Sequence, residues 1–278
     1  MIEMPSLSVA EFVRFQYLIE EETGIHLPDS KQPLLVARLS RRLRQLGIAS
    51  FGDYYDHVVG GPDPHERTVM YDAISTNETR FFREPRQFEL LTGTILPRLK
   101  ALAAAGEREK RVRIWSVGCS TGEEPYSLAM ILLDAFDPAE WKLQIDATDL
   151  STRVLDAARR GLWPIHKTAE IPERYVRRFM LRGTGAQEGY FQAGQALRSL
   201  IRFGRLNLTD SSYPMPSDYD LIFCRNVLIY FARARRIAVV RTLLSHLVAG
   251  GHLFLGHAET LSGIAQGPRS VLPAVYVK

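Results

Sequence analysis

The sequence contains little cysteine and no long hydrophobic run, and these two absences exclude several classes of protein. Its 278 residues include only Cys119 and Cys224, which form neither a disulfide framework nor the Cys-x-x-Cys pair of a metal site, so we expect both to be reduced. No segment approaches the roughly 18 to 20 apolar residues of a membrane-spanning helix. The N-terminus lacks the basic and apolar regions of a secretory signal. These features predict a cytoplasmic protein with no direct membrane insertion.

Recognisable metal-binding and oligomerisation patterns are also lacking. The seven histidines show no His-Glu-x-x-His or comparable spacing, so we expect His257 and the others to be structural and predict no metal. No long apolar heptad pattern marks an oligomerisation seam, and a monomer is therefore expected.

The net charge of +4 and the pI near 9.1 would suit a nucleic-acid binder, but basic and acidic residues alternate along most of the chain. The exception is the stretch 30–52, which has no acidic residue. On a helix that begins near Pro33, Arg38 and Arg42 would project together, and Lys31 would join them if the helix reaches back to it. This basic face is either a contact surface for an acidic partner or an ordinary solvated helix face.

Hydrophobic periodicity divides the chain in two. Apolar residues follow helical spacing over 8–74, starting from a capping-box pattern of Ser8 and Glu11. A long helix is expected over 86–103, followed by a glycine- and charge-rich segment. We therefore predict a helical N-terminal domain (1–75), a linker with a connecting helix (76–111) and a third region (112–278).

Strands and helices alternate in this third region. The alternation predicts a doubly wound α/β fold with a mainly parallel sheet, which binds ligands at the carboxyl ends of its strands. Closely spaced glycines predict a small antiparallel hairpin inserted at about 180–203. The expected strands are 112–117, 143–148, 219–224 and 252–256, and the expected helices are 125–136, 152–160 and 233–248.

The first expected strand runs into a glycine turn that suits ligand binding. Gly118 and Gly122 let a ligand approach the backbone, but the spacing is not the Gly-x-Gly-x-x-Gly of dinucleotide enzymes. Glu123 and Glu124 at the start of the next helix would repel a pyrophosphate. S-adenosylmethionine has no phosphate and carries cationic ammonium and sulfonium groups, so it fits better. The alternative is that the two glutamates only complement the helix dipole.

Polar residues also follow the later strands. Asp149 ends the second strand, where a carboxylate accepts hydrogen bonds from ribose hydroxyls, unless it is simply a helix N-cap. Arg225 and Asn226 end a buried strand, a position that favours the ligand crevice. Tyr230 is either a site residue or a core tyrosine with a free hydroxyl.

The segment 77–84 mixes two aromatic residues with two arginines and has the composition of a lid. Within it, Arg83 either holds a carboxylate through paired hydrogen bonds or forms a surface ion pair with Glu84 or Glu89.

Four motifs occur in the same order as the signatures of the CheR chemotaxis receptor methyltransferases, and the chain resembles that family over nearly its whole length. They are N-E-T-R-F-F-R-E at 77–84, S-T-G-E-E-P-Y-S at 120–127, F-C-R-N-V-L-I-Y-F at 223–231 and G-H-A-E-T at 256–260. The resemblance implies an all-helical N-terminal domain and a class I S-adenosylmethionine-dependent methyltransferase domain with a small β-subdomain. It also implies a protein-glutamate O-methyltransferase of chemosensory signal transduction, which produces glutamyl methyl esters and S-adenosylhomocysteine.

The resemblance implies roles for individual residues matched by motif position. Arg83 and Tyr230 would position the reacting carboxylate. Glu124 would contact the cofactor, with Glu123 as the alternative. The implied cofactor-binding residues are Asn77, Thr79, Arg83, Glu124, Asp149, Asn207, Leu208, Arg225 and Asn226.

The implied partner is the glutamate-rich cytoplasmic domain of a chemoreceptor. Lys31, Arg38 and Arg42 would dock it through complementary charge. The segment 182–189 resembles the turn through which some members bind a receptor's C-terminal peptide as an added strand, although an ordinary tight hairpin has the same composition.

Two rival interpretations stay open. A methyltransferase acting on nucleic acid would suit the pI, but the chain lacks the Asn/Asp-Pro-Pro-Tyr/Phe motif of base methyltransferases. The second rival interpretation is a signalling module that binds the cofactor without turnover. The presence of both Arg83 and Tyr230 argues against it.

Overall fold

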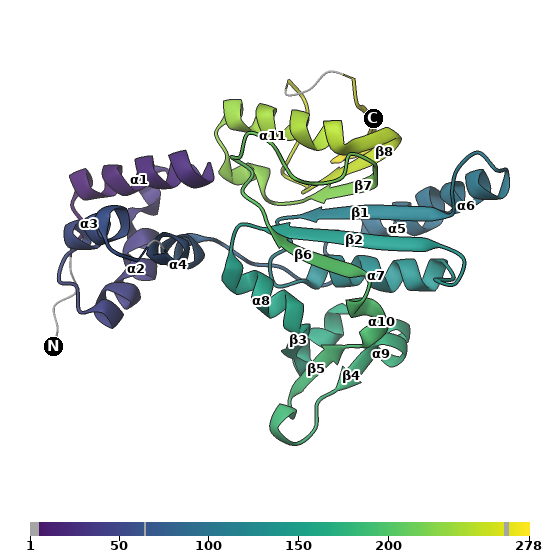
Figure 1. Ribbon diagram of the computed structural model, residues 1–278, viewed down its shortest axis with the longest axis horizontal. Helices are drawn as coiled ribbons and strands as arrows, with labels where there is room; N and C mark the ends of the chain where they lie inside the picture. Colours follow the sequence, from purple (N-terminus) through teal and green to yellow (C-terminus); the bar gives the residue numbers. More distant parts are fainter. Residues whose placement is uncertain (1–5, 64, 264–266) are drawn as a thin grey trace.

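The computed structural model describes residues 6–63, 65–263 and 267–278, which form a helical domain beside a larger α/β domain (Figure 1). Ser8 caps the first helix through the predicted capping box with Glu11, and Gly24 ends that helix with a φ of 73°. The apolar faces of the helices enclose one core. The helices of this domain are α1 (Val9–Thr23), α2 (Gln32–Leu46), α3 (Phe51–Gly60) and α4 (His65–Ile74), with a short 3-10 turn, η1 (Asp29–Lys31), before α2.

A buried carboxylate connects three of these helices. Glu66 on α4 is 1% exposed and accepts hydrogen bonds from Arg42 Nε on α2 and from the Tyr54 hydroxyl on α3, each at 2.9 Å. Burial alone would raise the pKa of Glu66, but the hydrogen bonds from Arg42 and Tyr54 outweigh it and lower the pKa. The charge of Arg42 is thus paired with a carboxylate of the same domain.

The connecting helix is interrupted rather than continuous. It consists of α5 (Pro85–Leu90), a π-helical turn, η2 (Leu91–Ile95), and α6 (Leu96–Ala104). Pro97 lies in the first turn of α6 and has no N–H to donate to the preceding turn, which gives a reason for the local change of helical geometry.

The larger domain contains a seven-stranded sheet in the order β6-β2-β1-β7-β8-β10-β9. The five strands β6, β2, β1, β7 and β8 are parallel to one another, and β10 is antiparallel to both β8 and β9. The doubly wound α/β prediction is confirmed. The strands are β1 (Arg111–Val117), β2 (Lys142–Asp149), β6 (Ile201–Arg205), β7 (Tyr219–Cys224), β8 (Leu247–Leu255), β9 (Arg269–Leu272) and β10 (Val275–Val277).

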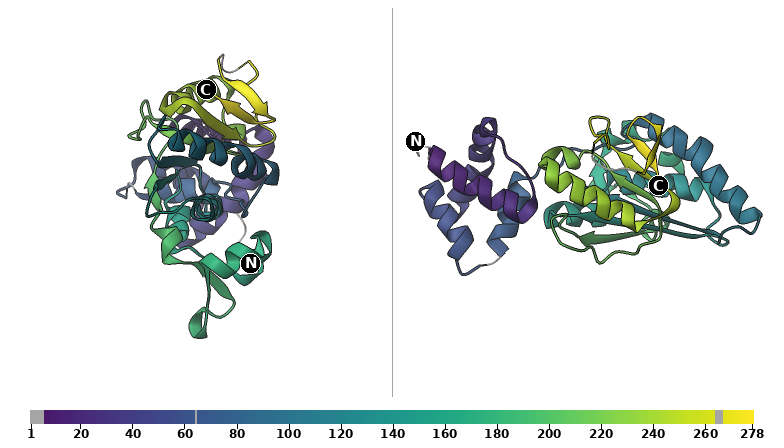
Figure 2. Two further views of the ribbon diagram at one scale, coloured as in Figure 1. Left: turned by 90° about the vertical axis from the view of Figure 1, so that its right-hand side faces the viewer. Right: turned by 90° about the horizontal axis from the view of Figure 1, so that it is seen from above.

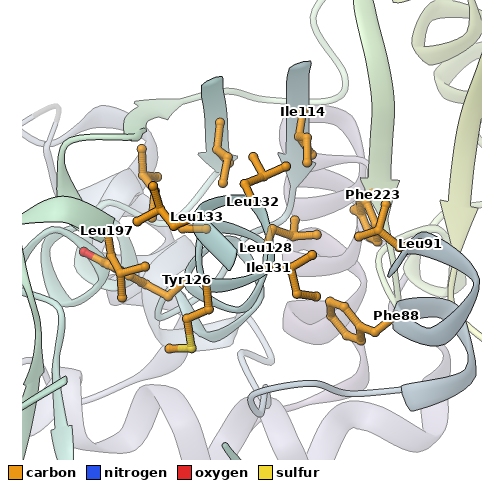
Figure 3. Packing of buried hydrophobic residues seen from close by; sticks show 14 of the residues in the cluster. Phe88, Leu91, Ile114, Tyr126, Leu128, Ile131, Leu132, Leu133, Leu197 and Phe223 are labelled. Carbon is orange, nitrogen blue, oxygen red and sulfur yellow. The ribbon is translucent and has the colours of Figure 1, made fainter. Parts of the chain in front are cut away.

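Helices cover both faces of this sheet (Figure 2). Alternate residues of β1 show the division, since Ile114 packs into one core and Trp115 into the other. The first core includes Leu128 of α7 and Phe88 of α5 (Figure 3). The second includes Leu243 of α11. The main helices of this domain are α7 (Glu123–Ala135), α8 (Thr152–Arg160) and α11 (Arg233–His246).

The inserted subdomain differs from the predicted hairpin at 180–203. It is a three-stranded antiparallel sheet in the order β3-β5-β4, and it begins at residue 162. The segment 201–205 does not belong to it, because β6 pairs in parallel with β2 at the edge of the large sheet. The first strand has three residues, too few to show alternation. The elements are β3 (Leu162–Pro164), η3 (Ile165–Glu170), α9 (Glu173–Phe179), β4 (Met180–Arg182), η4 (Gly185–Gln187) and β5 (Tyr190–Ala193), followed by α10 (Gln195–Arg198).

Replacing Glu66 by alanine should destabilise the helical domain strongly, because the Arg42 guanidinium and the Tyr54 hydroxyl would lose their partner. We expect a loss of roughly 3 kcal/mol or more in urea unfolding of the full chain at pH 7. Asp56→Ala, which removes the exposed ion pair of Asp56 with Arg14, is the control and should hardly change the midpoint.

The pH dependence of the Glu66 contribution has a defined sign. Because the pKa of Glu66 is lowered on folding, its contribution is present above about pH 4.5 and is lost as the pH falls through the folded value. The difference in the free energy of unfolding between wild type and Glu66→Ala should therefore shrink as the pH is lowered. A difference that stays constant or grows below pH 4.5 would contradict this assignment.

Candidate active site

A cavity of about 270 Å³ lies at the carboxyl ends of β1, β2 and β7. The helical domain lies beside these strand ends (Figure 1). Residues of both domains and of the segment between them contribute to its wall. Among the sequence-predicted site residues, those that line it are Lys31, Asn77, Thr79, Arg83, Glu124, Asp149, Asn207, Leu208, Arg225, Asn226 and Tyr230.

The glycine turn after β1 is fastened to the end of β2. Its backbone passes through the left-handed region at Gly118, Ser120 and Gly122, with φ values of 71°, 50° and 98°. A Cβ on Gly118 would come within 2.4 Å of the Val227 side chain, so glycine is required there. The Ser120 N–H donates to Asp149 Oδ2 at 2.9 Å. The turn and the acidic residue therefore form one unit.

Asp149 is not a helix N-cap, because Ser151 caps α8 with its side chain. The Asp149 carboxylate accepts backbone N–H groups of Ser120 and Ser151, both at 2.9 Å, and lines the cavity. Burial raises the pKa of Asp149, and these N–H donors partly oppose the increase.

The two adjacent glutamates have different environments. Glu124 lines the cavity and accepts hydrogen bonds from Ser116 Oγ and Arg225 Nε, each at 2.6 Å. Glu123 is fully buried away from the cavity wall and forms an ion pair with Lys167. Of the two alternatives, the structure brings Glu124 to the cavity.

Arg225 connects three parts of the site. It directly follows β7, and its guanidinium pairs with Glu124 at the start of α7. It also donates to the backbone carbonyl of Arg83 and to Gln87 Oε1, the latter at 3.3 Å. Its side chain is only 3% exposed. Arg225 thus fixes the segment between the domains against the sheet.

Glu259 holds the turn that carries Asn226 and Tyr230. Its buried carboxylate accepts the N–H groups of Gly256, Asn226 and Ile229 at 2.7, 2.9 and 3.1 Å. Burial raises the pKa of Glu259, and these donors work against the increase. Sequence reasoning missed this role, although the only acidic residue of the G-H-A-E-T motif was a signal for it.

Two buried polar atoms at the cavity have no protein partner among the described residues. They are Nδ2 of Asn77 and Oδ1 of Asn226. A buried donor and a buried acceptor without partners are costly unless a ligand satisfies them. S-adenosylmethionine carries acceptors in its carboxylate and adenine ring and donors in its ammonium and amino groups, so both atoms fit this cofactor.

The helical domain supplies part of the wall that sequence reasoning missed. Thr23, Ile25, Leu27 and Leu34 line the cavity, as does His26, whose N–H donates to the Tyr230 carbonyl at 2.8 Å. These contacts depend on how the two domains pack, and no local motif reports them.

The three basic residues of the predicted face, Lys31, Arg38 and Arg42, are not all exposed and unpaired among the described residues. Arg42 forms an ion pair with Glu66. Arg38 is half-buried, and its guanidinium donates hydrogen bonds to the Ile74 carbonyl oxygen and, at 3.1 Å, to Thr76 Oγ1. Lys31 is exposed. Helical spacing gave the direction of Arg42 but could not report the buried Glu66 carboxylate on another helix, and contact of Arg42 with a receptor stays a prediction.

The sheet order, the glycine turn after β1 and the acidic residue at the end of β2 define the chain as a class I S-adenosylmethionine-dependent methyltransferase. The family model described as CheR methyltransferase, SAM binding domain, matches residues 77–274, and the one described as CheR methyltransferase, all-alpha domain, matches 10–75. The chain belongs to the CheR methyltransferase family.

Relatives extend over most of the chain. Chemotaxis protein methyltransferase 2 of Pseudomonas aeruginosa is 38% identical over 91% of this chain and 88% of its own length. The chemotaxis protein methyltransferase of Salmonella typhimurium is 35% identical over 96% and 89%, respectively. A solved structure, the glycopeptide N-methyltransferase MtfA complexed with sinefungin, covers 70% of this chain and 57% of its own with 16% identity and a TM-score of 0.37.

Within residues 6–63, 65–263 and 267–278, no helix is both long and apolar enough to span a membrane. The same residues contain no group of three or more side chains suited to hold a metal ion.

Replacing Arg225 by alanine should abolish cofactor binding and reduce stability by roughly 3 to 5 kcal/mol, because Glu124 would be left as a buried unpaired charge. Calorimetric titration with S-adenosylhomocysteine and urea unfolding measure the two effects. Arg202→Ala, at an exposed position on β6, is the control. The double change Arg225→Met with Glu124→Gln should recover part of the stability but not the binding. A double variant no more stable than Arg225→Ala would contradict the ion-pair explanation.

Proposed function

We propose that the protein transfers a methyl group from S-adenosylmethionine to glutamate side chains of chemoreceptors, giving glutamyl methyl esters and S-adenosylhomocysteine. The cavity carries this proposal, since Arg83 and Tyr230 line the same space as the two asparagine atoms that have no partner among the described residues. The relatives named as chemotaxis protein methyltransferases support the receptor as substrate. A cytoplasmic location follows from the cytoplasmic domain of that substrate.

The chain's own residues would hold the cofactor at both ends. The Asp149 carboxylate would accept hydrogen bonds from the ribose hydroxyls. The Asn77 amide would donate to an acceptor of the cofactor and the Asn226 carbonyl oxygen would accept from a donor. Glu124 would lie near the cationic groups, although Ser116 and Arg225 already bind its two oxygens. Asn207 and Leu208 would complete the wall.

The reaction needs no general base in this arrangement. A glutamate has an unperturbed pKa of about 4.3 and is ionised at neutral pH, so its oxygen attacks a sulfonium methyl group directly. Arg83 would bind the carboxylate through paired hydrogen bonds and the Tyr230 hydroxyl would orient it. Holding the oxygen, methyl carbon and sulfur in line supplies the rate advantage.

Two surfaces support the choice of a receptor as partner. Lys31 is exposed at the cavity and would meet the acidic side chains of a receptor helix, and half-buried Arg38 would add to the positive potential. Strand β4 is an edge of the three-stranded sheet and exposes 58% of Leu181, so it would take up a receptor's C-terminal peptide as an added strand. We infer that a monomer carries out these steps.

Transfer of labelled methyl to membranes containing cognate chemoreceptors tests the proposal. We expect label on the receptor that is released by alkali, as a carboxyl ester requires. Label that resists alkali, or label taken up by added RNA or DNA instead, would reject glutamate methylation. Tight cofactor binding without any transfer would indicate a non-catalytic module.

Arg83→Ala should lower kcat/KM for receptor methylation by roughly a hundredfold, because a charge-assisted contact to the reacting carboxylate would be lost. Arg80→Ala, three residues earlier and exposed, is the matched control and should retain near wild-type activity. Equal losses in the two variants would argue against a specific role for Arg83.

A further inference from the structure

The loop 77–84 carries four cavity residues but has no helix or strand to hold its shape. Its backbone is also strained, because Phe82 and Glu84 have φ values of 50° and 64°. Non-glycine residues adopt this left-handed region at a cost of roughly 1–2 kcal/mol each. Contacts from outside the loop must therefore impose its conformation.

Two side chains of η3, within the small antiparallel subdomain, bind the backbone of this loop. Glu170 Oε2 accepts the N–H of Phe81 at 2.8 Å, and Lys167 Nζ lies 3.4 Å from the Thr79 carbonyl oxygen, to which it donates. The buried ring of Phe81 packs edge-on against Trp163 of β3, with centroids 5.0 Å apart. The loop is thus attached to the subdomain by backbone and side chain.

The same subdomain also binds the glycine turn. Trp163 Nε1 donates to the Thr121 carbonyl oxygen at 3.3 Å. The Lys167 ammonium forms an ion pair with the fully buried Glu123, which begins α7 directly after the turn. Lys167 therefore bridges the two segments that approach the cofactor cavity from different parts of the sequence.

We propose that Lys167 and Glu170 are positioning residues for the cofactor: η3 sets the spacing between the loop 77–84 and the glycine turn, and so sets cofactor affinity. Neither residue lines the cavity, so each acts through the residues it holds. The inference rests on the proposed cofactor site and assigns to the subdomain a role within it.

The first test is calorimetric titration of S-adenosylhomocysteine into the full chain carrying Glu170→Ala. Removal of the acceptor leaves the Phe81 N–H without its partner, and we expect the Kd to rise about tenfold. Glu170→Gln keeps an oxygen acceptor at the same place and should stay within about threefold of wild type. Glu173→Ala, on the next helix in a largely exposed ion pair with Arg177, is the control and should bind normally.

A second readout reports the loop itself. Arg80 is exposed and is followed by the buried Phe81, so tryptic cleavage after Arg80 requires the loop to open. Cleavage should be several-fold faster in Glu170→Ala and unchanged in Glu173→Ala. For Lys167, the pair Lys167→Met with Glu123→Gln avoids an unpaired buried carboxylate and should also weaken binding.

The outcomes separate this inference from the proposed function. If wild type binds S-adenosylhomocysteine but Glu170→Ala binds it equally well with unchanged cleavage, the positioning role is rejected and the cofactor site stands. A Glu170→Gln variant that binds S-adenosylhomocysteine as weakly as Glu170→Ala would also reject it, since an oxygen acceptor for the Phe81 N–H would then not be enough to hold the loop. If wild type shows no binding, the cofactor site and this inference fail together.

Discussion

The site depends on one buried ion pair, between Arg225 directly after β7 and Glu124 at the start of α7. Removing Arg225 would leave Glu124 as a buried charge without a cationic partner, and removing Glu124 would leave Arg225 with only the more distant Glu84 carboxylate, at 3.8 Å. The pair is satisfied further by Ser116 on β1 and by the carbonyl of Arg83. A strand end, a helix start and the segment between the domains are thereby held in one arrangement, and each contributes a residue to the cavity wall.

Hydrophobic periodicity and strand-end chemistry identified much of this arrangement from sequence. Alternating strands and helices predicted the doubly wound sheet, and polar residues after buried strands predicted the positions of Asp149 and Arg225 at one edge. These inferences succeed because they use local rules, namely side-chain alternation and the alignment of parallel strand ends. The structure places both residues on the cavity wall, while their contacts with a cofactor stay a prediction.

The elements that sequence reasoning missed depend on long-range packing. Helical spacing gave the direction of Arg42 but could not report Glu66, which lies 24 residues away on another helix. The predicted range of the subdomain, 180–203, began too far along the chain because β3 has only three residues. It also included β6, which has the length of a hairpin strand but joins the large sheet. His26 reaches the Tyr230 carbonyl only because the two domains are packed together. None of these contacts leaves a periodic signal.

The strain in the backbone is concentrated where function is proposed. Of the five described non-glycine residues with positive φ, four lie in or beside the site: Phe82, Glu84, Ser120 and Asn226. Glycine would relieve the strain at each position, but the side chains are in use. The Phe82 ring stacks on Tyr175, and the Ser120 hydroxyl donates to the Asn77 carbonyl at 2.9 Å. Asn226 presents at the cavity a buried oxygen that no described residue hydrogen-bonds. Folding thus already includes the free-energy cost of ordering these residues, so a cofactor would bind to a cavity that is formed in advance.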